Sequence, residues 1–337
     1  MKKIVALILT DTHLTKSNYA LVRSIFEQAI DICKEKDIKR IYHIGDFFTS
    51  REAQPLNVLL EAQEIFSMIK KSGIKLSIVA GNHDKVSLES EDSYLDVFDK
   101  DCILIKKEYS EEVDGLNICW LPYFKEKGSY SKRLNNITDG IIRHKKNILL
   151  THIAIDGVSN NDSSPVENDI KRTLFKEFDK VLCGHYHFQQ NFENIYYIGS
   201  SHASNFGEDS MKGFTLLYDD ASIEFIKSKF PEYIKIKVDV DDKKQLLELE
   251  KKHANSKDNV RFVLTGNKEK LQSFKKDGLV GKGIDIKFES DDVIVSSNNE
   301  KVQVYDRSNL KVAFDKFVLA NEIKDKEFGE NYLEKIL

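Results

Sequence analysis

Short apolar runs and amphipathic segments alternate over the first part of the chain. The run Ile4–Leu9 is apolar at every position, as expected for a strand buried on both faces of a sheet. Apolar residues then recur at helical spacing up to Cys33, which predicts a helix with Ser17 as its N-cap. Pro55 begins a second amphipathic stretch, and Gly73 is expected to stop it. The other elements expected here are a helix over residues 55–71 and strands over residues 41–44 and 76–80.

The alternation of strand and helix implies a parallel sheet with helices covering it. In such sheets, functional residues gather beyond the carboxyl ends of the strands. Asp11, Asp46 and Asn82 each follow a predicted strand. We therefore expect these three side chains to meet at one edge of the sheet.

Strands follow one another more closely in the second part of the chain. Short connections between several of them predict a second, mixed sheet that packs on the first. The expected strands are Leu116–Leu121, residues 148–150, 180–183, 195–198 and 214–218, and Ile223–Lys227.

A compact α/β unit and a helical tail are expected after this two-sheet region. The unit combines strands over residues 233–240, 260–264 and 285–288 with helices over Lys243–His253 and residues 268–275. Two apolar stripes at helical spacing predict a pair of helices after Asp306. The stripes consist of Leu310, Phe314, Phe317 and Val318, then Phe328, Tyr332, Leu333 and Ile336. The expected domains are residues 1–229, an α/β capping domain over residues 230–304, and a tail over residues 305–337.

Composition narrows the classes of protein. The 337 residues are 41% hydrophobic and 31% charged, which fits a soluble protein with a main domain and a smaller one. The net charge of −4 gives no global basic signature for nucleic acid. The four cysteines are scattered without C-x-x-C spacing and indicate reduced core residues of a cytoplasmic protein. No apolar stretch is long enough to span a membrane, and the apolar run after Met1 is too short for a signal peptide.

Five short motifs place metal-ligand side chains just past predicted strands. A site with two divalent ions about 3.5–4 Å apart can clamp the attacking and leaving oxygens of a phosphate ester, and it needs a carboxylate that bridges the ions. Asp46 is the candidate for that bridge. The mixture of oxygen and imidazole ligands suits Mn, Fe or Zn better than Mg or Ca. The motifs are Asp11-Thr12-His13, Gly45-Asp46, Gly81-Asn82-His83-Asp84, Thr151-His152 and Gly184-His185-Tyr186-His187.

The remaining ligands divide between the two ions. Asp11, His13 and His187 can complete one ion, and Asn82, His152 and His185 the other. The three motif glycines, at positions 45, 81 and 184, are expected to permit tight turns and close backbone approach.

Two residues beside the ligand Asn82 are expected to act in the chemistry. His83 need not bind metal, and next to two cations it can protonate the leaving oxygen or stabilise the developing charge. Asp84 is expected to orient that imidazole. Both are candidate catalytic residues.

The motifs together resemble the calcineurin-like metallophosphoesterase superfamily over about residues 1–225. The resemblance implies an α/β fold, the two-sheet metallophosphoesterase sandwich flanked by helices. The superfamily includes protein phosphatases, nucleotidases, cyclic phosphodiesterases and DNA nucleases, so it leaves the substrate open. The residues that fall on its motifs are Asp11, His13, Asp46, Asn82, His83, His152, His185 and His187.

A narrower block resembles the SbcD-type nucleases, the nuclease subunits of a DNA repair and recombination complex. It runs from Tyr197-Ile198-Gly199-Ser200 through Phe206-Gly207-Glu208 to Lys212-Gly213-Phe214, and Gly45-Asp46-Phe47-Phe48 also looks like that family. Two positions depart from the pattern. Thr15 stands where the family usually has Gly, and Thr49 stands where it often has His or Asp. These departures bear on exonuclease polarity or efficiency, and metal binding should not change.

The resemblance implies a Mn²⁺-dependent DNA nuclease, phage or bacterial in type, with 3′-to-5′ exonuclease and single-strand endonuclease activity. It also implies an SbcC-type ATPase partner, a homodimer and a cytoplasmic location, in the host cytoplasm if the chain is phage-encoded. Arg51, on the loop after Asp46, is the basic residue favoured as a substrate phosphate contact. Two alternatives remain open, a metallophosphatase acting on a small molecule or phosphoprotein, and a scaffold subunit for the ATPase.

Overall fold

The first sheet of the fold contains the strands that precede the first three ligand motifs. In the computed structural model of the chain, residues 2–161, 164–254, 256–273 and 284–290 are described, together with Phe314 and Val318. The central strands β1 to β4 run parallel, and β11 and β12 add antiparallel to the β1 edge. In spatial order the sheet contains β12 (Ile223–Lys227), β11 (Gly213–Tyr218), β1 (Ile4–Leu9), β2 (Arg40–Ile44), β3 (Lys75–Val79) and β4 (Ile103–Ile105).

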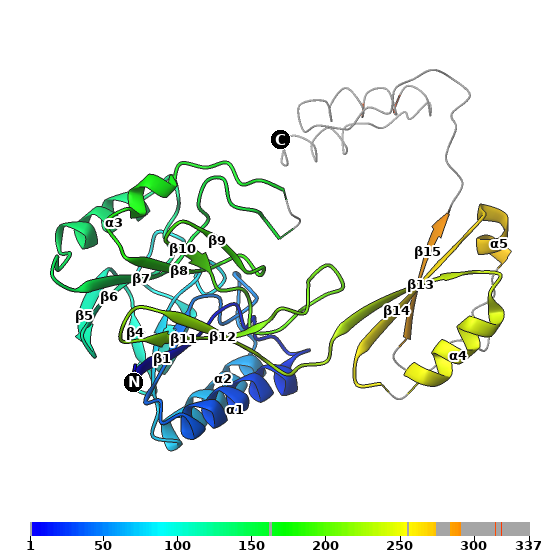
Figure 1. Cartoon of the computed structure of the whole chain (residues 1–337), viewed down its shortest axis with the longest axis horizontal. Helices are drawn as coiled ribbons and strands as arrows, with labels where there is room; N and C mark the ends of the chain where they lie inside the picture. The colour runs from blue at the N-terminus through cyan, green and yellow to red at the C-terminus, as the bar shows by residue number, and fades with distance from the viewer. Residues whose placement is uncertain are drawn as a thin grey trace.

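A second six-stranded sheet packs on the first (Figure 1). Its strands β6, β7, β8 and β10 are parallel, and β5 and β9 pair antiparallel at the two edges. In spatial order it contains β5 (Tyr109–Val113), β6 (Leu116–Leu121), β7 (Lys146–His152), β8 (Lys180–Gly184), β10 (Ile195–Tyr197) and β9 (Gln190–Phe192). The expected two-sheet α/β sandwich is therefore confirmed.

Apolar side chains fill the space between the sheets and under the helices. Ile8 from β1, Trp120 from β6 and Leu150 from β7 belong to the central core between the sheets. Because both faces of β1 are covered, its sequence is apolar throughout instead of alternating. The outer faces are covered by α1 (Tyr19–Glu35) and α2 (Leu56–Lys71) on one side, and by α3 (Tyr130–Asp139) on the other (Figure 1). Two short 3₁₀ helices, η1 (Tyr94–Phe98) and η2 (Arg172–Phe175), lie in the connections.

The beginning of α1 differs from the sequence expectation. The helix starts at Tyr19, and Asn18 stands at the N-cap, so the prediction of Ser17 was wrong. Asn18 does not cap the helix with its side chain. Its Oδ1 accepts from the backbone N–H of Thr15 at 2.8 Å, and its Nδ2 donates to the carbonyl oxygen of His13 at 2.9 Å. The side chain of Asn18 therefore forms its hydrogen bonds within the loop that carries His13, instead of capping the helix.

The α/β unit expected after the sandwich contains a third, smaller sheet. The strands β13 (Tyr233–Asp239), β14 (Asn259–Gly266) and β15 (Ile284–Ser290) are parallel in that order. The helices α4 (Lys243–His253) and α5 (Lys268–Ser273) belong to the same unit, which has its own apolar core (Figure 1). The helical tail expected over residues 305–337 lies outside the described residues, apart from Phe314 and Val318.

Candidate metal centre

All five ligand motifs lie at carboxyl ends of parallel strands. Asp11 and His13 follow β1, Asp46 follows β2, and Asn82 follows β3. In the second sheet, His152 is the last residue of β7, and His185 and His187 follow β8. The parallel strands of both sheets end along the same side of the sandwich, so residues far apart in sequence meet there.

Four of these residues have left-handed backbone conformations. The φ angles are 51° at Asp11, 45° at His13, 55° at Asp46 and 94° at His185. Such angles are uncommon for residues with a Cβ and cost on the order of 1–3 kcal/mol each when they are strained. The chain turns sharply at these positions, which lie just past the ends of the strands.

The three motif glycines permit close packing around these turns, as the sequence predicted. A Cβ at Gly45 would lie 2.3 Å from His152 Nδ1, and Gly45 also has a φ of +101°. A Cβ at Gly81 would lie 2.2 Å from Asp46 Oδ1. A Cβ at Gly184 would lie 2.2 Å from Thr10 Oγ1 and 2.7 Å from His152 Nδ1. Each glycine therefore makes room for a site residue or its neighbour.

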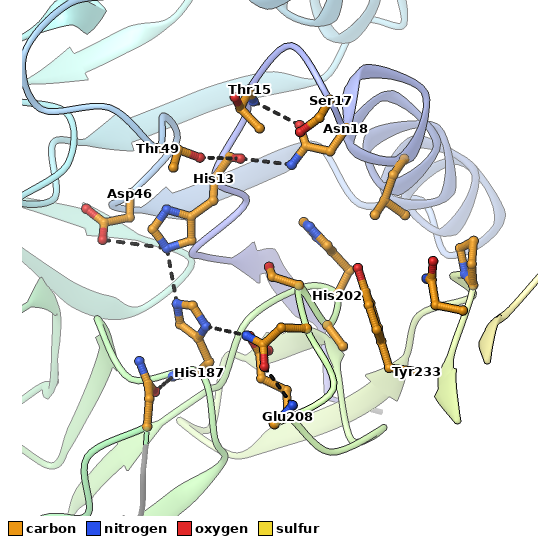
Figure 2. Close-up of a pocket in the computed structure, with 18 of the residues that line it drawn as sticks. His13, Thr15, Ser17, Asn18, Asp46, Thr49, His187, His202, Glu208 and Tyr233 are labelled. Carbon is orange, nitrogen blue, oxygen red and sulfur yellow. Dashed lines mark hydrogen bonds and ion pairs between the residues drawn. The ribbon is translucent and has the colours of Figure 1, made fainter. Parts of the chain in front are cut away.

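The first cluster consists of Asp11, His13 and His187, whose ligand atoms lie within 4.8 Å of one another. The Nε2 atoms of His13 and His187 face each other at 3.1 Å (Figure 2). Asp11 Oδ1 lies 3.8 Å from His13 Nε2 and 4.0 Å from His187 Nε2. This is the group that the sequence assigned to one ion.

The second cluster consists of Asp46, His152 and His185. His152 Nε2 lies 3.3 Å from Asp46 Oδ2. Asn82, which the sequence assigned to this group, is beside it, because its Oδ1 is 3.0 Å from His185 Nδ1. The Nδ1 of His152 lies 2.9 Å from the carbonyl oxygen of Ile44, and a hydrogen bond there leaves Nε2 free to act as a ligand.

Asp46 stands between the two clusters. The same oxygen, Oδ2, lies 3.3 Å from His152 Nε2 and 3.8 Å from His13 Nε2. Its other oxygen, Oδ1, accepts from the backbone N–H of His83 at 2.8 Å. One carboxylate oxygen is thus fixed by the backbone while the other faces both groups, which is the placement that a bridging ligand requires.

The donor atoms in the centre fit divalent cations. Asp11 Oδ1 is buried and has no hydrogen-bond partner among the described residues. Unsatisfied buried polar atoms are uncommon in proteins, and one explanation is an ion that they bind. The set of carboxylate, amide and imidazole groups matches the ligands that borderline divalent metals take. The residues present are therefore compatible with two ions.

Burial and charge set the protonation of these groups. Burial, and then the neighbouring His152, lower the pKa of His185 to about 3, so its imidazole is neutral at pH 7. Burial alone would lower the pKa of His152, but the Asp46 carboxylate outweighs it and raises that pKa to about 9. Burial alone would raise the pKa of Asp46, but the nearby imidazoles, His152 first among them, hold it well below its usual value. Asp46 is therefore ionised.

His83 lies beside the clusters without belonging to either. Its Nδ1 is 2.5 Å from the carbonyl oxygen of Thr49, and its Nε2 accepts from Arg51 Nη2 at 3.1 Å. Thr49 also donates through Oγ1 to the carbonyl oxygen of His13 at 2.7 Å. Thr49, one of the two departures from the family pattern, therefore contacts the imidazole of His83 and the backbone of His13. The sequence did not indicate this role, because a carbonyl contact leaves no signature in residue type.

The expected contact between Asp84 and the His83 imidazole is not formed. Asp84 is fully buried, and its carboxylate accepts from the backbone N–H groups of Phe47, Phe48 and Gly81 at 3.2, 2.8 and 2.8 Å. These bonds tie the loop after Asp46 to the loop that carries Asn82. Asp84 faces away from this imidazole because three buried backbone donors of the two loops need an acceptor. Burial and then the charge of Asp46 raise the pKa of Asp84 to about 7.

An open groove leads away from the metal centre (Figure 2). Its volume is about 1320 Å³, and it extends from Asp46 and His83 past the start of α1 to Tyr233 of β13 and Asn259 of β14. The wall includes His202, for which the sequence suggested no role. Burial lowers the pKa of His202 to about 3, so it adds no charge to the groove. Uncharged polar side chains line much of the remainder, namely Thr15, Ser17, Asn18, Ser24, Thr49, Asn160, Asn161, Ser204 and Asn205.

One known protein family matches the part of the chain that contains these motifs. The sequence profile of the calcineurin-like phosphoesterases matches residues 4–189, which contain all five ligand motifs. The chain therefore belongs to the calcineurin-like phosphoesterase family, and it is a metallophosphoesterase.

Two curated proteins are similar to this chain over slightly more than half of its length. The DNA double-strand break repair protein Mre11 of Methanocaldococcus jannaschii is 26% identical over 198 residues, covering 53% of this chain and 50% of that protein. Exonuclease subunit 1 of Enterobacteria phage T4 is 25% identical over 221 residues, covering 60% of each protein. The chain thus spans between half and three fifths of the length of these relatives.

A solved dimetal phosphatase from Danio rerio has 8% sequence identity and a TM-score of 0.45, covering 64% of this chain and 93% of that one. A TM-score this low carries no conclusion about function. Among the described residues, no helix has the length and apolar character needed to cross a membrane.

Proposed function

We propose that this metallophosphoesterase is a DNA phosphodiesterase that acts as a 3′-to-5′ exonuclease and a single-strand endonuclease in DNA recombination, repair or replication. The observation that carries the proposal is the open groove that continues from the ligand clusters to the third sheet. A phosphate monoester would occupy only the end beside Asp46 and His83. A groove of about 1320 Å³ is larger than the usual small-molecule pocket of roughly 300–1000 Å³ and has room for several units of a polymer.

We infer that two divalent ions, with Mn²⁺ as the proposed metal, complete the site. In this assignment Asp46 would be shared between them. Asp11, His13 and His187 would hold one ion, and Asn82, His152 and His185 would hold the other. When bound, the ions supply Lewis-acid activation of the phosphate and of the attacking water. This division is supported by the position of Asp46 Oδ2, which lies 3.8 Å from His13 Nε2 of one group and 3.3 Å from His152 Nε2 of the other.

The protein's own groups then act on the ester. His83 presents Nε2 at the surface of the site, where it can hold a proton for the leaving oxygen or stabilise the charge that develops there. Arg51 shares that surface, so its guanidinium can bind a non-bridging phosphate oxygen in place of the imidazole. Asp84 acts through the backbone by holding the loops of Asp46 and Asn82 together.

The proposed partners are DNA, an SbcC-type ATPase and a second copy of the chain. The names of the two relatives, an Mre11 repair protein and an exonuclease subunit, support DNA as substrate and an assembly with another subunit. Residues 230–304 are the proposed capping domain. Residues 305–337 are the proposed ATPase contact, because they carry two apolar stripes. Leu56 and Leu60, one turn apart and exposed on α2, offer an apolar face for a homodimer.

A nuclease assay with Mn²⁺ tests the proposed function. We expect the chain to degrade linear and single-stranded DNA, and a phosphorothioate cap on the 3′ end to block degradation of a duplex. The control is Asp46→Ala, prepared in the same way, which excludes a contaminating nuclease. Rapid hydrolysis of p-nitrophenyl phosphate with intact DNA would favour a phosphatase instead. Binding of a coexpressed ATPase without hydrolysis of either substrate would favour a scaffold.

A further inference from the structure

Glu208 and Lys212 form a buried charged pair beside the first cluster. Both lie in the connection between β10 and β11, and their side chains are 4% and 0% exposed. Lys212 Nζ lies 3.2 Å from Glu208 Oε2. Lysine and glutamate are almost never fully buried unless they are paired, and removal of one partner leaves the other charge uncompensated. A pair at this depth is therefore tied to its surroundings more firmly than a surface ion pair.

Both members of the pair contact His187. Glu208 Oε1 lies 3.2 Å from the Nδ1 of its imidazole (Figure 2). Lys212 Nζ donates to its backbone carbonyl oxygen at 2.6 Å. Glu208 Oε1 also accepts from Asn205 Nδ2 at 3.0 Å, which fixes the carboxylate. The imidazole and the backbone of His187 are thus held from two directions by residues of one loop.

The Glu208 contact decides which nitrogen of His187 faces the cluster as a lone pair. An ionised carboxylate only accepts hydrogen bonds, so the proton of the neutral imidazole must reside on Nδ1. Nε2 then carries the lone pair. This atom lies 3.1 Å from His13 Nε2 and 4.0 Å from Asp11 Oδ1, inside the first cluster.

No other imidazole of the two clusters has such support among the described contacts. The Nδ1 of His152 lies against the carbonyl oxygen of Ile44, and that of His185 against the amide oxygen of Asn82. The Nδ1 of His13 is buried and has no hydrogen-bond partner in the part of the chain that the structure describes. A carboxylate partner raises the basicity of an imidazole ligand more than a neutral acceptor does. Glu208 therefore supports an imidazole of the first cluster and none of the second.

We propose that Glu208, held in place by Lys212, is a positioning residue that orients His187 and sets the metal affinity of the first cluster. Glu208 would not touch the substrate or act in the chemistry. The assignment also gives a physical reason for the Phe206-Gly207-Glu208 and Lys212-Gly213 sequence block, whose charged members converge on a single histidine.

The test is Mn²⁺ binding by Glu208→Gln, measured by equilibrium dialysis of the full chain. The change keeps the shape of the side chain and removes its charge. We expect one of the two ions to bind roughly 10–100-fold more weakly, the usual effect of losing such a partner, and the other to bind as in the wild type. Saturating Mn²⁺ should restore hydrolysis of bis(p-nitrophenyl) phosphate, because the ligands themselves remain.

Asp209→Asn is the matched control. Asp209 lies in the same loop, 3.8 Å from Lys212 Nζ, but its side chain is 43% exposed and it makes no contact with His187 among the described interactions. This variant removes an equal charge and should bind both ions normally. Wild-type affinity for both ions in Glu208→Gln, equal weakening of both, or the same shift in Asp209→Asn would overturn the proposal.

A second variant keeps the proposal testable if the first variant does not fold. If Glu208→Gln does not fold, Glu208→Asp makes the same test, because it keeps the charge beside Lys212 and withdraws the carboxylate from His187 Nδ1. We expect the same single ion to bind more weakly, and unchanged affinity in this variant would count against the positioning role.

Discussion

Gly81→Ala should disrupt the metal centre without altering any ligand. A Cβ at this position would lie 2.2 Å from Asp46 Oδ1 and 2.3 Å from the backbone nitrogen of Asp46. Backbone atoms cannot move away as freely as the end of a side chain. The surroundings are also fixed, because Asp84 accepts from Gly81 N–H at 2.8 Å and from the backbone N–H of Phe48 at 2.8 Å.

The size of the effect follows from these distances. Real Cβ atoms essentially never approach another heavy atom closer than 3.0 Å, so Gly81 and Asp46 must separate by about 0.8 Å, close to the 1 Å misplacement that can lower a rate roughly 10²-fold. Forcing extra volume into a packed site also costs about 1–3 kcal/mol of stability. We therefore expect turnover to fall about 10²-fold, with weaker binding of the ions that Asp46 is proposed to bridge.

The assay is hydrolysis of bis(p-nitrophenyl) phosphate over a Mn²⁺ titration, with thermal unfolding of the same samples. Gly140→Ala is the matched control, since a Cβ there would meet its nearest atom, the carbonyl oxygen of Ile137, at 3.4 Å. Gly140 ends α3 with a φ of −93°, which alanine adopts without strain. Wild-type turnover and metal binding in Gly81→Ala would refute the reasoning, because the close approach would then not constrain Asp46.

Three further substitutions test the separate roles of Asp46, His83 and Asp84 in the site. Asp46→Ala should abolish activity, because the carboxylate that faces both clusters is lost, and survival of activity and metal content would show that Asp46 does not bridge. His83→Ser should keep both metal content and DNA affinity while turnover falls roughly 10²–10⁴-fold, and loss of an ion would instead make His83 a ligand. Asp84→Asn should lower both activity and stability, the latter by about 1–3 kcal/mol, because an amide nitrogen would face backbone donors. Unchanged thermal unfolding of that variant would argue against its role in joining the loops.

Residue type and strand order were enough to predict which candidate ligand side chains lie together. Asp11, His13 and His187 meet as expected, because parallel strands must end on the same side of their sheets. The helical spacing before Cys33 likewise predicted every buried residue of α1. These residues are Val22, Ile25, Phe26, Ala29, Ile30 and Cys33.

The parts that the sequence did not predict depend on contacts without a local pattern. Asp84 was assigned to His83 because it is near in sequence, whereas the backbone donors that it satisfies come mostly from the loop after Asp46. The helix α3 was missed because it has only ten residues and buries three of them, Tyr130, Leu134 and Ile137. Glu208 reaches His187 from a different connection, and only the folded chain brings the two together.

Each cluster draws its side chains from both sheets. Asp11 and His13 extend from the first sheet to meet His187 of the second, and Asp46 of the first meets His152 and His185 of the second. Ions held there would act as staples along one rim of the sandwich, while at the opposite rim the ion pair of Arg40, at the start of β2, with Asp114, between β5 and β6, joins the two sheets. At a free metal concentration 100-fold above Kd, one such staple would add about 2.7 kcal/mol to the folded state. A chelator should therefore speed amide exchange at the carboxyl ends of β1 and β8 and leave their amino ends protected.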